Sequence, residues 1–127
     1  MLLTLSSPFF WTAMPMRTLE DGRSQLRQRV DYWSRRLKAE PRIIRIQRMT
    51  RKWGSCSMKG IITLADDLAD QESGFRDFVI AHELLHLRVP NHGRLFKALM
   101  SAHVPDWRKH DVARLNPTSP RIPKRSK

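Results

Sequence analysis

The segment His82-Glu83-Leu84-Leu85-His86 constrains this chain more than any other, because two histidines four positions apart enclose a glutamate. Residues four apart lie on the same face of an α-helix, so a helix here lets His82 and His86 bind one metal ion. Glu83 lies one residue further round, where its carboxylate can reach a water on the ion without ligating the ion itself. The segment predicts a helix that carries a hydrolytic metal site.

A third histidine, His92, follows after Val89-Pro90-Asn91, where the helix is expected to stop and the chain to turn back. A catalytic zinc takes three protein ligands and leaves one position open for water. The chain has 5 histidines, and three of them fall between positions 82 and 92. The alternatives are incidental histidines on a surface helix, or a core histidine bonded to a backbone carbonyl. Because two imidazoles and a carboxylate in an apolar stripe are costly without an ion, we favour zinc.

Hydrophobic spacing and turn residues predict three helices, one of which carries the histidine segment, and three short strands. Leu26, Val30, Trp33 and Leu37 share one helical face, and Lys59-Gly60 suits a tight hairpin turn. Asn91 is expected to cap the third helix and Pro105 to close it. The expected helices span residues 17–39, 75–88 and 92–102, and the expected strands span residues 42–49, 53–57 and 60–64.

The two ends of the chain differ in composition from its centre. Residues 1–16 are apolar but interrupted by Pro8 and Pro15, so we interpret them as an N-terminal arm or as a mis-assigned start. They are too short and broken to cross a membrane. Residues 116–127 are rich in proline and basic residues and are expected to form a disordered tail. The remainder, residues 17–115, is long enough for one domain with one modest core.

Charge and cysteine content bound the partners and the compartment. The single cysteine, Cys56, excludes a disulfide within the chain, which favours a reducing compartment such as the cytoplasm. The net charge of +12 predicts attraction to DNA, nucleotides or other anions. The plainer interpretation is a solvated basic surface without a specific partner, and the sequence does not decide between the two.

Several segments together resemble the YgjP-like metallopeptidase domain, a branch of the SprT-like zincins. They are Trp53-Gly54-Ser55-Cys56, Gly60-Ile61-Ile62-Thr63-Leu64, the histidine-glutamate segment at 82–86, and Pro90-Asn91-His92-Gly93. The likeness covers about residues 26–109, and the chain departs from it at Ala65, where relatives usually have asparagine. The resemblance implies a zincin-like α+β fold, in which a small antiparallel or mixed sheet packs on the active-site helix beside flanking helices. It also implies that His82, His86 and His92 hold zinc and that Glu83 is catalytic.

Zincins commonly bind an extended peptide along a sheet edge above the active-site helix, which makes Trp53, Gly54 and Ser55 candidates for substrate binding. The alternative, which we favour, places Trp53 in the core and makes Gly54 a bulge. Cys56 is expected to be a buried, unreactive thiol. Asp77 and Asp111 are candidates to orient a ligand histidine, and the sequence does not choose between them.

The motif and the resemblance together predict a zinc-dependent hydrolase, in first place a metalloendopeptidase that acts on a peptide or protein and uses Glu83 to activate a zinc-bound water. Two alternatives stay open. The first is a zinc-dependent hydrolase of nucleotide phosphoanhydrides, with the basic surface holding the phosphates. The second is a non-catalytic nucleic-acid-binding module with structural zinc, for which a free Glu83 would have no use.

Overall fold

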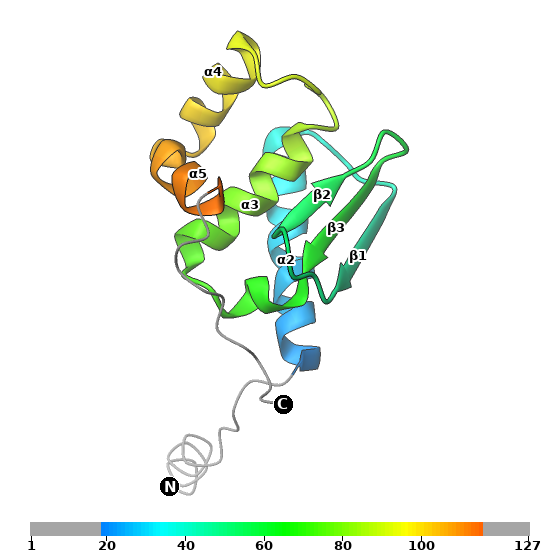
Figure 1. Cartoon of the computed structure of the whole chain (residues 1–127). Coiled ribbons are helices and arrows are strands. Elements are labelled where there is room, and N and C mark those ends of the chain that lie inside the picture. The colour runs from blue at the N-terminus through cyan, green and yellow to red at the C-terminus, as the bar shows by residue number, and fades with distance from the viewer. Residues whose placement is uncertain (1–18, 116–127) are drawn as a thin grey trace, which may run out of the picture.

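Helix α3 (Ser73–Leu85) lies at the centre of the molecule, with the sheet on one side and the other helices around it (Figure 1). The computed structural model describes residues 19–115; the predictions for residues 1–16 and for the basic tail lie outside this range. Helix α3 contacts α2 (Leu19–Leu37), strand β2 (Gly54–Cys56), α4 (Arg94–His103) and α5 (Trp107–Leu115). This is the α+β arrangement that the sequence predicts.

Helix α2 forms because its apolar residues share one face. Leu26, Val30, Trp33 and Leu37 are all buried in the core. The helix ends at Leu37, and the next residue, Lys38, has a φ of 54°, the left-handed conformation that commonly closes a helix. The predicted helix is therefore confirmed, and it ends two residues earlier than expected.

The sheet has the strand order β1-β3-β2 and is mixed. Strand β1 (Ile43–Gln47) runs parallel to β3 (Ile61–Ala65), whereas β2 pairs with β3 in the antiparallel sense. The turn between β2 and β3 places Gly60 at φ 84°, a conformation that suits glycine and confirms the predicted hairpin turn. Because β2 is at the edge of the sheet, one side of its backbone is not paired with another strand of residues 19–115.

Helix α3 begins and ends earlier than the sequence predicts. It starts at Ser73 rather than Phe75, and its last helical residue is Leu85 rather than Arg88. His86 is the residue that caps it, and the chain then tightens through bonds from Leu87 N to Leu84 O (3.0 Å) and from Arg88 N to Leu85 O (3.0 Å). The tightening precedes Pro90, so proline is not the immediate cause of the helix end.

The third predicted helix starts two residues too early in the sequence analysis. Helix α4 is capped by Gly93, with no side-chain cap, so the prediction that Asn91 caps it is wrong. His92 instead lies in the loop before the helix, where its ring is free to face back toward α3. Helix α5 and the short 3-10 helix η1 (Asp66–Asp70) were not predicted from the sequence.

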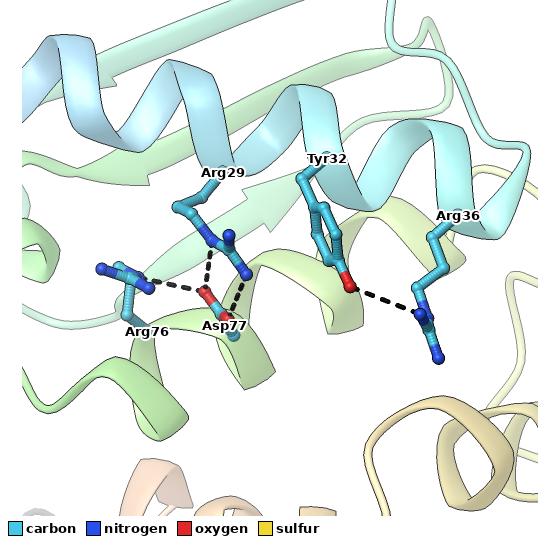
Figure 2. Close-up of polar contacts among 5 residues, drawn as sticks. All are labelled: Arg29, Tyr32, Arg36, Arg76 and Asp77. Atoms are coloured by element: carbon cyan, nitrogen blue, oxygen red, sulfur yellow. Dashed lines mark hydrogen bonds and ion pairs between the residues drawn. The ribbon is translucent and has the colours of Figure 1, made fainter.

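An ion pair links α2 to α3 (Figure 2). The Arg29 guanidinium donates to both oxygens of Asp77, from Nη2 at 2.7 Å and from Nε at 3.2 Å. Arg76 donates to the same carboxylate at 3.0 Å.

Across residues 19–115, no helix combines the length and apolar composition needed to cross a bilayer.

Candidate metal centre

Three histidine side chains converge where α3 ends. His82 comes from the last turn of α3, His86 caps that helix, and His92 reaches in from the loop before α4. One ring nitrogen from each lies within 4.8 Å of the others. The Nε2 atoms of His86 and His92 are 2.8 Å apart. This group can hold a metal ion, and it contains the three ligands that the sequence predicts.

Neighbouring groups fix how the three rings face one another. His86 has a hydrogen bond with the backbone of Val89, made possible by the tight turn after α3. His82 Nδ1 lies 3.1 Å from Glu83 Oε2. When Nδ1 carries the proton, the lone pair of Nε2 is free to bind a metal. Phe96 of α4 is buried and packs on all three rings, with centroid distances of 4.7 to 5.4 Å.

The lowered pKa values of His86 and His92 favour metal binding. Burial, with repulsion from His82, lowers the pKa of His86. Desolvation of its ring, with repulsion from His82 and Arg114, also lowers the pKa of His92. A histidine must be neutral to ligate a metal. Both rings are therefore ready to bind at a lower pH than an ordinary histidine.

Glu83 is buried, with 6% of its surface exposed, and strand β2 lies directly over its side chain. A Cβ atom added to Gly54 would lie 3.1 Å from Glu83 Cγ, 3.3 Å from Leu64 Cδ2 and 3.3 Å from the Thr63 carbonyl oxygen. Gly54 therefore allows the strand to approach the carboxylate. This contact explains why a glycine stands here, and sequence reasoning did not identify it.

An open groove of about 1470 Å³ runs along β2 and reaches Glu83 and His86. Its size exceeds the roughly 300–1,000 Å³ of pockets that hold small molecules, so an extended ligand suits it better. Trp53, Gly54 and Ser55 all line it. Their predicted role in substrate binding stays a prediction.

For Trp53 the structure shows features of both alternatives, a core residue and a groove residue. For Gly54 it excludes the predicted bulge. Trp53 is half-buried, packs against the core and stacks edge-on with Phe75 at 5.4 Å, while it also faces the groove. Gly54 pairs in regular register with Leu64, so it is not a bulge. Cys56 is half-buried rather than buried, and burial together with the charge of Glu83 raises its pKa.

The structure shows no hydrogen bond from the three histidines to Asp77 or Asp111, the two aspartates considered as their partners. Asp77 bonds with Arg29 and Arg76 (Figure 2). Asp111 accepts two bonds from Arg114, at 2.6 and 3.0 Å, and acts on His92 only through its charge. The orienting groups are instead Glu83 and the Val89 backbone, and a sequence does not reveal a backbone contact of this kind.

Comparison with known proteins agrees with this geometry. The family model described as "YgjP-like, metallopeptidase domain" matches residues 17–116. No curated protein matches the chain closely enough to count as a relative.

Two solved structures are similar in fold. The metallopeptidase zymogen jannalysin of Methanocaldococcus jannaschii is 21% identical, with a TM-score of 0.60, over 68% of this chain and 90% of that one. The metallopeptidase zymogen abylysin of Pyrococcus abyssi is 18% identical, with a TM-score of 0.58, over 71% of this chain and 94% of that one. At these identities the likeness is one of fold. Because the family model covers most of the sequence, the chain belongs to the YgjP-like metallopeptidase domain family.

Proposed function

We propose that this metallopeptidase is a zinc-dependent endopeptidase in which His82, His86 and His92 hold the ion and Glu83 is the general base. The observation that carries the proposal is the group of three imidazoles beside a buried carboxylate, with that carboxylate and His86 both lining an open groove. Three nitrogen ligands with room for a further ligand are typical of catalytic zinc, whereas structural zinc is closed by four protein ligands.

The zinc, when bound, would lower the pKa of a coordinated water and polarise the peptide carbonyl. The chain itself supplies the proton transfers. Glu83 takes a proton from the attacking water and returns it to the leaving nitrogen. Its burial beneath β2 limits competition from bulk solvent, and Gly54 allows the edge strand to lie close to its side chain.

A substrate peptide would pair with the free edge of β2. The Trp53 carbonyl accepts from Ala65 N (2.9 Å), and Ser57 N donates to Ile61 O (2.9 Å), so these groups point toward β3. Because bonding direction alternates along an antiparallel strand, the backbone groups of Gly54 and Cys56 point outward. An extended peptide added there would lie beside Glu83.

The other two interpretations of the sequence are less well supported. Membership in a metallopeptidase family does not favour a nucleotide hydrolase or a non-catalytic nucleic-acid-binding module. The single cysteine, Cys56, fits a cytoplasmic location, since it has no partner within the chain for a disulfide.

The test is the substitution Glu83→Gln in zinc-loaded protein. Glutamine at this position keeps the size of the side chain but cannot take a proton, so we expect about one zinc per chain and a loss of casein cleavage of about 10²-fold or more. Glu72→Gln is the matched control, because Glu72 is exposed and does not line the groove. Wild-type activity in the Glu83→Gln protein would remove the assigned base.

A further inference from the structure

Basic side chains dominate the charged part of the groove lining. They are Arg42, Arg51, Lys52, Lys59 and Arg114, against two acidic residues, Glu40 and Glu83. Asp111 offsets the charge of Arg114 at 2.6 Å, and Glu83 belongs to the catalytic centre. Four basic groups and one exposed carboxylate therefore remain to face a ligand.

These four basic groups have no carboxylate partner among residues 19–115. Elsewhere in that range, Asp31, Asp66 and Asp77 form ion pairs with arginines of α2. The four groove side chains are all exposed. Since they are solvated and unpaired, an arriving carboxylate need not displace an existing ion pair.

Arg42 is held in place at the turn between β2 and β3. Its guanidinium donates to the Lys59 carbonyl at 3.1 Å. Its aliphatic stem packs on Gly60, where an added Cβ would lie 3.2 Å from Arg42 Cγ. A positioned guanidinium loses less side-chain entropy on binding a carboxylate than a free one does.

The four charges lie on both sides of the point where β2 crosses Glu83. Arg51 and Lys52 precede Gly54 by three and two residues, whereas Lys59 follows Cys56 by three residues with Arg42 bonded to it. A strand rises about 3.3 Å per residue, so Lys59 is at most about five residues' length from Gly54 along a bound peptide. A peptide paired with β2 would meet basic groups on both sides of its scissile bond.

We propose that this groove selects acidic peptides, with aspartate or glutamate on both sides of the cleaved bond read by Arg42, Lys59, Arg51 and Lys52. The proposal rests on the peptidase function proposed above and names its substrate class. A nucleotide would need its cationic groups gathered at one point around the phosphates. Here they are spread along the strand, which favours an extended acidic chain.

The experiment uses zinc-loaded full-length protein and quenched fluorescent peptides that share one central dipeptide. The flanking residues on both sides are aspartate, asparagine or lysine. Because exposed ion pairs are individually weak, we expect kcat/KM to be about tenfold higher for the aspartate than for the asparagine peptide at about 50 mM salt, and lowest for the lysine peptide. The advantage should shrink at about 300 mM salt.

A double variant and its matched control separate the groove from the overall charge. Arg42→Gln/Lys59→Gln should reduce the aspartate-to-asparagine ratio about threefold or more. Arg45→Gln/Lys109→Gln removes one arginine and one lysine that do not line the groove, and it should keep the wild-type ratio. An equal fall in both variants would overturn the proposal, as would a wild-type ratio near one.

Failure of this proposal differs from failure of the peptidase function. Glu83-dependent cleavage of the asparagine peptide with no preference for aspartate would end the proposal and leave the peptidase. If no peptide is cleaved, binding of labelled peptides to zinc-loaded Glu83→Gln protein decides, by fluorescence anisotropy. Equal affinities for the aspartate, asparagine and lysine peptides would overturn the acidic-peptide proposal. So would wild-type protein that hydrolyses ATP and binds it more tightly than the aspartate peptide.

Discussion

Replacing Gly54 with alanine tests whether close packing of the edge strand on Glu83, the proposed general base, matters for activity. The new Cβ would lie 3.1 Å from Glu83 Cγ, whereas ordinary contacts begin at about 3.4 Å. Its other close neighbours are Leu64, which is fully buried, and the backbone oxygen of Thr63 in the central strand. Because those two are held by the core and the sheet, the Glu83 side chain must move by a few tenths of an ångström.

The expected magnitude follows from that displacement. A misplacement of about 1 Å costs about 10²-fold in rate, so a few tenths should lower kcat by about three- to tenfold. Crowding of this kind costs about 1–3 kcal/mol of stability, and each kcal/mol lowers Tm by roughly 4–8 °C in a domain of this size. Zinc content should not change, since the three histidines are not among the atoms that the new Cβ meets.

The assay combines peptide hydrolysis, metal analysis and thermal denaturation of Gly54→Ala beside Gly93→Ala. Gly93 is next to His92, a proposed metal ligand, yet an added Cβ there meets nothing within 4 Å. We expect Gly93→Ala to stay within about twofold of the wild-type kcat, allowing for a small helix-cap effect. A Gly54→Ala protein with wild-type kcat would show that this contact does not position Glu83, and so would one whose activity falls only because zinc is lost.

Three further predictions concern the metal centre and the groove beside it. His82→Ala and His92→Ala should both lose zinc, but in metal-free protein only the first should cost about 2 kcal/mol or more of unfolding free energy, because His82 is buried and His92 exposed; equal denaturant midpoints would contradict this. The pKa values of His86 and His92 are lowered, so the unfolded chain takes up their protons first and metal-free protein should lose stability as pH falls below about 6.5. Melting curves from pH 7.5 to 5.5 test this slope, which should flatten in a His86→Gln/His92→Gln variant. Burial and Glu83 raise the pKa of Cys56, so iodoacetamide should modify it more slowly than a free cysteine peptide, and faster in Glu83→Gln than in the wild type; no difference between the two proteins would argue against their proximity.

The parts of the fold that were predictable are those with a strong local pattern. The apolar face of α2 and the glycine turn between β2 and β3 each follow from a few neighbouring residues. Helix α5 was missed because its apolar face is weak: Trp107 is its single buried large hydrophobic residue. Its other buried side chain is His110, which packs on Phe78 rather than on an aliphatic cluster.

The residues of the candidate site were predictable from the sequence, but the helix boundaries and the contacts that position them were not. The spacing of His82, His86 and His92 identifies a group that the structure brings together. Helix α3 ends at Leu85 in a tight turn of backbone hydrogen bonds, and α4 begins only after Gly93, so Pro90 and Asn91 gave the wrong boundaries. Contacts across the fold, such as Phe96 on the three rings, have no local signal in the sequence.

X-ray absorption at the zinc edge shows directly whether the three histidines bind the metal. For zinc-loaded protein with one ion per chain, the account predicts three imidazole nitrogens at about 2.0–2.1 Å and one further light scatterer. The imidazole signal should fall by one third in any His92→Ala protein that still retains metal. A thiolate sulfur at about 2.3 Å, which Cys56 could supply from the groove wall, would contradict the account, as would protein that stays metal-free in excess zinc.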